Sequence, residues 1–279
     1  MDNNSEASLT VEMVRSALTT TLLGNRIRHY AQVASTNEIA RDAGRRGERE
    51  GLVVLAEEQT AGRGRLGRVW VAPTGCCILC SVLLRPRFPP RQAFYLTIAA
   101  SLAIRRAVTR LSTASAQRGE GGEIECSIKW PNDVMVRGRK ISGVLCESEF
   151  RGGAWDFVVM GFGINVNLPL EALGELASTA TSLSIEAERE IDRVGFLSSV
   201  LGELESLYLL MQGGAFGPIF SEWQSALETP GKRVSVLAAQ GRVEGRAVRV
   251  DYDGALIVET EAGREVRVVA GDLLPLGAE

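Results

Sequence analysis

The chain has 279 residues, 45% of them hydrophobic, and a formal net charge of −3 at pH 7. This near-balanced charge disfavours broad electrostatic binding to DNA or RNA, and no apolar run approaches the ~20 residues needed to span a bilayer. The length suits one large domain, or a large domain with a small companion. Because residues 1–8 contain no hydrophobic signal core, we expect a cytoplasmic protein.

The first elements are a helix, a strand and a second helix. Apolar spacing predicts a helix over residues 10–23, and an apolar–polar stretch predicts a strand over 26–33. Ser35 or Thr36 can cap a helix over 37–43, whose free amides would face a ligand cavity. Helix capping alone also explains these two residues.

A glycine- and arginine-rich loop follows a predicted buried strand at 51–56. The loop contains Gln59, Gly62, Arg63, Gly64, Arg65, Gly67, Arg68 and Trp70. Glycine lets a backbone turn sharply and approach a ligand, and guanidinium groups suit carboxylates and phosphates. A disordered basic tract or an RNA-contacting segment is the alternative. The apolar runs on both sides favour a mobile anion clamp.

The next stretch is predicted to be a strand at 76–84, an amphipathic helix at 92–111 and a surface loop at 112–123. Five cysteines occur, an odd number, and most lie in or beside apolar runs: Cys76, Cys77, Cys80, Cys126 and Cys146. The spacing of Cys77 and Cys80 suits a metal or redox site, but no second ligand pair accompanies it. We therefore expect buried, reduced thiols.

A second polar block lies at 128–147. Pro131-Asn132-Asp133 predicts a turn between strands, and a second turn precedes Lys140. The resulting hairpin would bring Lys129, Asp133 and Lys140 to one end of a sheet. Two ammonium groups and a carboxylate suit an activated phosphate ester or its magnesium. An exposed hairpin with solvated charges is an equally good interpretation of this block alone.

The last part of the chain begins with a strand at 155–163. Gly161 and Gly163 suggest backbone close to a ligand, with Asn165 and Asn167 as amide partners. Helices are predicted at 192–211 and 216–227. Valine-rich alternation with turn signals over 231–276 predicts a small β-barrel.

Four separated blocks together resemble the bacterial biotin–protein ligases, in the same order along the chain. They are Ser35-Thr36-Asn37, Gln59 with the Gly62–Trp70 segment, Lys129 to Gly143 and Gly161 to Asn167. The resemblance implies an α/β (α+β) catalytic domain with a mixed, largely antiparallel sheet over residues 1–228. It implies an SH3-like β-barrel over 229–279. The short N-terminal leader resembles the monofunctional type, without a DNA-binding domain.

The resemblance also implies a two-step reaction. The carboxylate of biotin attacks the α-phosphate of ATP to give biotinyl-5′-adenylate and pyrophosphate. A lysine of a biotin carboxyl carrier protein, from a carboxylase such as acetyl-CoA carboxylase, then attacks the mixed anhydride and releases AMP. The first step joins two anions, so it needs cationic screening. Mg²⁺ would arrive with ATP, and no protein metal site is expected.

The resemblance assigns roles to individual residues. The biotin-binding residues would be Ser35, Thr36, Asn37, Gln59, Arg63, Gly64, Arg65 and Lys140. The nucleotide-binding residues would be Arg65, Arg68, Trp70, Lys129, Asn132, Asp133 and Asn165. The catalytic residues would be Arg65, Lys140, Lys129 and Asp133. Phe162 stands where many relatives carry a smaller aliphatic residue, so packing at the adenine pocket is expected to differ.

Two other functions share parts of this pattern. Lipoate or octanoyl ligases and transferases have the same catalytic fold, but the C-terminal barrel and the Gly-Arg loop favour biotin. A biotin-responsive DNA-binding repressor is disfavoured by the short leader and the acidic balance. Both a monomer and a homodimer fit the sequence.

Overall fold

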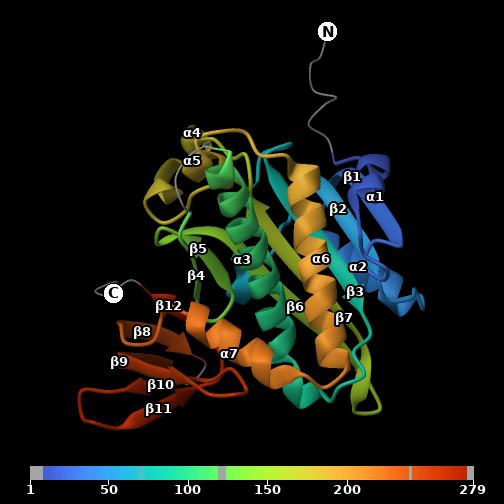
Figure 1. Ribbon diagram of the computed structural model, residues 1–279. Helices are drawn as coiled ribbons and strands as arrows, with labels where there is room; N and C mark the ends of the chain where they lie inside the picture. Colours follow the sequence, from blue (N-terminus) through green and yellow to red (C-terminus); the bar gives the residue numbers. More distant parts are fainter. Residues whose placement is uncertain (1–8, 69, 71, 119–123, 239–240, 275–279) are drawn as a thin grey trace.

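The structure is a computed structural model, and it describes residues 9–68, 70, 72–118, 124–238 and 241–274. A seven-stranded sheet carries helices on both faces, and a smaller five-stranded sheet lies beside it (Figure 1). The larger unit contains α1 (Val11–Ala17), β1 (Arg26–Val33), α2 (Thr36–Arg45), β2 (Leu52–Gln59), η1 (Arg65–Gly67), β3 (Cys77–Leu84), η2 (Pro90–Gln92), α3 (Phe94–Gln117), β4 (Cys126–Lys129), β5 (Asp133–Val136), β6 (Arg139–Arg151), β7 (Ala154–Asn165), α4 (Leu170–Leu173), η3 (Gly174–Ser178), α5 (Leu183–Ala187), α6 (Arg193–Gln212) and α7 (Phe216–Ala226).

The seven strands lie in the order β1-β2-β3-β7-β6-β5-β4. Only the β1–β2 pair is parallel, and every other neighbouring pair in this sheet is antiparallel. The predicted mixed, largely antiparallel sheet is therefore confirmed. Because β1 and β2 run in the same direction, their C-terminal ends lie side by side. The helix α2 begins just after β1, and the arginine-rich loop begins just after β2, so both start at this end of the sheet.

Both faces of the sheet are covered, and β2 shows this directly. Val53 and Leu55 pack in the large core under α3 and α6. Leu52 and Val54 pack on the other face, against Ala40 of α2. Successive strand residues point to opposite faces, so a strand covered on both faces needs a continuous apolar run. We call the second face the α2 face.

Two long helices, α3 and α6, pack together and cover the face opposite α2 (Figure 1). Among the described residues, α6 alone is long and apolar enough to cross a membrane, but more than half of it is buried in this core. Its apolar composition is explained by packing against α3 and the sheet. The strand predictions at 26–33 and 76–84 hold within one residue.

Two predictions of where a helix ends need correction. The first helix ends at Ala17 instead of residue 23, because the carboxylate of Glu205 on α6 accepts hydrogen bonds from the amides of Thr21, Leu22 and Leu23. The predicted loop at 112–123 is wrong at its start, because α3 continues to Gln117. Part of that prediction, residues 119–123, lies outside the described residues.

The C-terminal unit is a five-stranded antiparallel sheet in the order β11-β10-β9-β8-β12. Its strands are β8 (Arg233–Ala238), β9 (Gly241–Val250), β10 (Leu256–Glu259), β11 (Glu265–Val268) and β12 (Gly271–Leu274). The predicted small C-terminal β domain is therefore confirmed, but within the described residues β11 and β12 are the two edges, so its sheet is not closed into a barrel. The domain boundary between residues 228 and 229 remains a prediction.

Candidate active site

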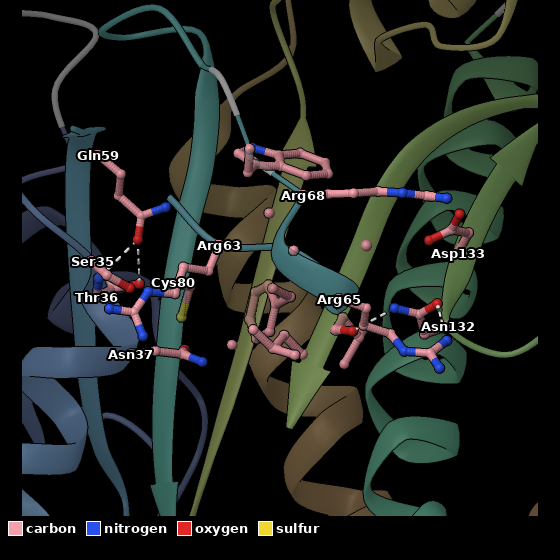
Figure 2. A pocket seen from close by; sticks show the side chains of 18 of the residues that line it. Ser35, Thr36, Asn37, Gln59, Arg63, Arg65, Arg68, Cys80, Asn132 and Asp133 are labelled. Atoms are coloured by element: carbon pink, nitrogen blue, oxygen red, sulfur yellow. Dashed lines mark hydrogen bonds between the residues drawn. The ribbon is translucent and has the colours of Figure 1, made fainter. Parts of the chain in front are cut away.

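A pocket opens on the α2 face where β3, β7 and β6 pass beneath the arginine-rich loop. It draws together residues that lie far apart in the sequence (Figure 2). Its lining consists of Ser35, Thr36, Asn37, Gln59, Arg63, Gly64, Arg65, Arg68, Trp70, Cys80, Asn132, Asp133, Lys140, Gly143, Val144, Leu145, Gly161, Phe162, Gly163 and Asp272. Twelve of these residues were predicted as site residues from the sequence: Ser35, Thr36, Asn37, Gln59, Arg63, Gly64, Arg65, Arg68, Trp70, Asn132, Asp133 and Lys140.

One side of the pocket is a neutral hydrogen-bonding group at the start of α2. The amide and the hydroxyl of Thr36 both donate to Oε1 of Gln59, at 2.8 and 3.0 Å. Ser35 occupies the N-cap position, but its side chain makes no capping hydrogen bond. Capping therefore does not use the Ser35 hydroxyl, which lies at the pocket wall.

A buried hydrogen-bond network fixes the side chain of Asn37. Ser81 Oγ lies 2.6 Å from Asn37 Oδ1 and 2.7 Å from Thr36 Oγ1. Asn37 Nδ2 donates to Glu147 at 2.7 Å, and Arg41 forms an ion pair with the same carboxylate. Because the oxygen and the nitrogen of its side-chain amide both have hydrogen-bond partners, Asn37 has a fixed orientation.

The floor between the two sides is made by glycines of β7. A Cβ on Gly161 would lie 2.1 Å from Asn37 Oδ1, and a Cβ on Gly163 would lie 2.5 Å from the Trp70 indole. Both distances are too short for any other residue without displacement of those side chains. These glycines permit close approach of the protein's own Asn37 and Trp70 side chains, and the expected approach of a ligand remains a prediction.

The opposite side of the pocket is cationic. Arg65, Arg68, Asn132 and Asp133 lie together on that side in Figure 2. Lys140 Nζ pairs with Asp133 at 2.7 Å and lies 5.7 Å from the centre of the Trp70 ring, a cation–π distance. The hairpin thus brings Asp133 and Lys140 together as predicted.

Arg65 and Arg63 have different surroundings. Burial, together with neighbouring Arg68, lowers the pKa of Arg65, whereas Asp272 and Asp133 act in the opposite direction. A guanidinium group remains protonated in proteins, so Arg65 is a partly buried cation at the pocket wall. Arg63 forms an ion pair with Glu38 of α2, at the boundary between the neutral and cationic groups.

Three predicted residues lie elsewhere. Lys129 ends β4, in register with Asp133, and does not line this pocket. The amide of Asn165 donates to the Thr181 carbonyl at 3.0 Å, and Asn167 bonds the backbone of Ile191. Asn165 and Asn167 therefore have structural partners. The proposed nucleotide-binding roles of Lys129 and Asn165 remain predictions.

Sequence reasoning missed Asp272, Ser81 and Glu147. Asp272 comes from β12 of the smaller sheet and pairs with Arg68 at 2.8 Å. An acidic residue buried within a short apolar strand is an unusual feature, and it is the signal that could have drawn attention to Asp272. Ser81 and Glu147 carry no such signal, because strands tolerate both residue types on a solvated face.

The five thiols are free, and none of them has a lowered pKa. Burial raises the pKa of Cys77, Cys126 and Cys146 to about 12 in each case. Cys80 lines the pocket and is completely buried, and its pKa is raised as well. Thiols held protonated in this way are poor nucleophiles, so the pocket chemistry must come from its charged and amide groups.

Comparison with known proteins agrees with this geometry. Residues 30–165 match the biotin/lipoate A/B protein ligase family, and residues 229–273 match the biotin protein ligase C terminal domain. The biotin–[acetyl-CoA-carboxylase] ligase of Mycobacterium tuberculosis is 35% identical over 249 residues, covering 88% of this chain and 87% of the relative. The bifunctional ligase/repressor BirA of Bacillus subtilis is 33% identical over 251 residues, covering 90% of this chain and 74% of the relative.

The structural comparison extends over both units. A biotin protein ligase from Aquifex aeolicus, solved in complex with biotin and ATP, has a TM-score of 0.72 at 27% identity, covering 90% of this chain and 98% of that chain. Fold and pocket together define a ligase with an α/β catalytic domain and a small C-terminal β domain. The chain belongs to the biotin protein ligase family. The resemblance seen in the four sequence blocks is therefore confirmed.

Proposed function

We propose that this ligase activates biotin with ATP as biotinyl-5′-adenylate and transfers the biotinyl group to a lysine of a biotin carboxyl carrier domain. The observation that carries the proposal is one pocket with a neutral, amide-lined side and a cationic side. The Aquifex relative binds biotin and ATP, and the M. tuberculosis relative is named for acetyl-CoA carboxylase.

The neutral side suits the ureido group of biotin. Ser35, Thr36, Asn37 and Gln59 supply hydroxyl, amide and carbonyl groups at fixed positions. A site built to hydrogen-bond such a group rejects ligands that lack it far better than an apolar pocket does. We expect Arg63 and Arg65 to bind the carboxylate at the other end of the vitamin.

The cationic side suits the first chemical step. A carboxylate oxygen of biotin attacks the α-phosphorus of ATP, the bond to the β-phosphate oxygen breaks, and pyrophosphate leaves. Arg65, Arg68 and Lys140 lower the repulsion between the two anions and stabilise charge in the transition state. In the second step the neutral lysine amine attacks the acyl carbon, the bond from this carbon to the AMP oxygen breaks with its electrons leaving on AMP, and the nitrogen loses a proton to solvent as the amide forms.

Magnesium fits this pocket as a companion of ATP. Among the residues that the structure describes, no cluster of three or more His, Cys, Asp or Glu side chains is placed to hold a metal ion, and Asp133 and Asp272 are the two carboxylates that line the pocket. Magnesium in nucleotide sites is held largely by phosphates and water, with one or two carboxylates. Mg²⁺ would supply further charge neutralisation at the phosphates.

The experiment is mass spectrometry of a candidate carrier domain after incubation with the enzyme, biotin and MgATP. One added biotinyl group is expected. Reactions without ATP, and a carrier whose acceptor lysine is changed to arginine, are the controls. No added mass, with no AMP formed, would reject the proposal. Lipoyl transfer in a parallel reaction with lipoate would assign the enzyme to the lipoate branch of the matched family.

The remaining proposals concern where the enzyme acts, its oligomeric state and whether it binds DNA. We propose action in the cytoplasm, where carboxylases and ATP are found together, as a monomer or homodimer without DNA binding. Sedimentation at micromolar protein, with and without biotin and MgATP, tests the oligomeric state. Binding to duplex DNA at nanomolar protein would contradict the last proposal.

A further inference from the structure

One pocket residue comes from the smaller sheet. Asp272 lies in β12, which pairs with β8, and its carboxylate reaches the cationic side of the pocket. The side chain is only 10% exposed. A carboxylate with so little contact to water is costly unless cations pair with it.

The cations that pair with Asp272 both belong to the arginine-rich loop. Arg68 Nη2 lies 2.8 Å from Oδ2, and Arg65 Nη1 lies 3.9 Å from Oδ1. Within the described part of the chain, these two guanidinium groups are the cations within ion-pair distance of Asp272. A phosphate placed at this side of the pocket would need the same two groups.

Arg65 and Arg68 differ in how freely their side chains can change conformation. The Arg65 side chain is 22% exposed, and Nη1 also lies 3.4 Å from Asn132 Oδ1. The Arg68 side chain is 58% exposed, so it can turn away from Asp272 with little loss of packing. Arg68 is therefore the group for which Asp272 and a ligand anion compete.

We propose that Asp272 is a positioning residue that acts as the internal counter-ion of Arg65 and Arg68 and competes with the triphosphate of ATP for Arg68. This inference rests on the proposed use of ATP. The carboxylate keeps the two guanidinium groups at the pocket and lowers the apparent affinity for ATP. The smaller sheet thereby sets the nucleotide affinity of a site built mainly by the larger unit.

The test is the isosteric variant Asp272→Asn, which removes the charge. With the competitor gone, the Kd of MgATP measured by calorimetry without biotin should fall ~3–10-fold, as should the KM for ATP. The KM for biotin should change less than about twofold. A structural role alone would instead raise both KM values or lower the melting temperature with no gain in ATP affinity.

Two controls define the mechanism. Asp251→Asn removes the same charge from the smaller sheet, where Asp251 pairs with Arg249 and Arg267, and should leave the Kd of MgATP unchanged. In an Arg68→Gln background, Asp272→Asn should have little effect, because the contested cation is gone. If Asp272→Asn does not fold, Asp272→Ser carries the same expectation.

The outcomes separate this inference from the proposed function. An unchanged or raised Kd of MgATP in folded Asp272→Asn, or an equal gain in the Arg68→Gln background, would overturn the inference alone. Absence of biotin-dependent AMP formation by the unaltered enzyme would overturn the proposed function, whatever the variants show.

Discussion

At the residue scale, two glycines on one strand separate the two ends of the pocket. Gly161 and Gly163 lie on the same face of β7, beneath Asn37 and Trp70 respectively. Neither needs an unusual backbone angle, so each is glycine because of what lies above it. Substitution at each position should therefore affect a different ligand.

Gly161→Ala should raise the KM for biotin by ~10-fold or more, because its Cβ displaces Asn37. Gly163→Ala should raise the KM for ATP by a similar factor, because its Cβ displaces the Trp70 indole. Steady-state kinetics with each substrate varied in turn measures both effects. Gly217→Ala, on an exposed turn of α7 with open space around it, is the control. Equal effects on both substrates would contradict the division of the pocket.

Arg65→Ala should lower the rate of biotin transfer to the carrier by at least ~10²-fold, because a partly buried cation proposed to stabilise charge in the transition state is removed. Arg242→Ala, an exposed arginine of β9, should leave the rate unchanged. Labelled biotin on the carrier lysine is the readout. A near-normal rate in Arg65→Ala would remove Arg65 from the catalytic residues.

Most of the pocket was predictable at this scale because its residues stand in short, distinctive blocks. Ser35 to Asn37 and Arg63 to Arg68 each combine residue types that serve a ligand better than a core. The acidic residue in the short apolar strand β12 was a signal for Asp272, but its partners were not predictable, because Arg65 and Arg68 belong to a distant loop. Ser81 was not predicted for a related reason, because its partners Thr36 and Asn37 belong to a different element.

At the element scale, the carboxylate of Glu205 ties α6 to the segment before β1. It accepts hydrogen bonds from three consecutive amides, those of Thr21, Leu22 and Leu23, each at 2.7 Å. Burial alone would raise the pKa of Glu205, but these amides outweigh burial and hold it below the usual value. A side chain nearly two hundred residues away along the chain thus prevents the first helix from continuing.

Glu205→Gln should lower the free energy of unfolding by ~1–3 kcal/mol near pH 7, because charge-assisted hydrogen bonds are lost. A carboxylate with a lowered folded pKa stabilises above its unfolded pKa, about 4.3, and loses that contribution as the pH falls through the folded value. The difference between the two proteins should therefore shrink below about pH 4. Urea unfolding at several pH values measures it, with exposed Glu190→Gln as the control. A difference independent of pH would contradict the ionic role.

Helix ends were less predictable than strands. The apolar run of β3 predicts where the strand begins and ends, because both faces of this central strand are covered. The segment 112–117 appears polar enough for a loop, yet α3 includes it. The buried Ser112 hydroxyl accepts a hydrogen bond from the Ile124 amide at 2.8 Å, and the Thr113 hydroxyl bonds the Thr109 carbonyl. Such backbone partners are invisible in a hydropathy pattern.

At the scale of the whole molecule, a turn of the smaller sheet is inserted against the larger unit. The indole nitrogen of buried Trp130 donates to the Gly254 carbonyl at 2.8 Å. Gly254 has a φ of +89°, and a Cβ there would lie 2.1 Å from the Phe94 ring of α3. The two sheets are therefore fixed to each other by packing as well as by Asp272.

Gly254→Ala should lower the free energy of unfolding by ~2–4 kcal/mol, from a strained φ and a clash with Phe94. Gly263→Ala is the matched control, because its φ is also positive but the space around it is open. Its expected cost is only about 1 kcal/mol. Differential scanning calorimetry compares the two variants. Equal losses would show that Phe94 does not confine this turn.

The sequence indicated the second unit but not how its edges are arranged. Valine alternation and glycine turns located the strands, because a period of two is a local property. Closure depends on whether β11 and β12 meet, and the described strands leave them at opposite ends of the sheet. Instead of pairing with β11, β12 contacts the arginine-rich loop through the ion pairs of Asp272.

The position of Asp272 has a consequence for biosynthesis. The ribosome synthesises the pocket residues between positions 35 and 163 before it synthesises α6, α7 or the second sheet. During that interval Arg65 and Arg68 lack the carboxylate that later neutralises them, and polyanions of the cell can contact them. The last strand of the chain therefore supplies the carboxylate that completes the pocket.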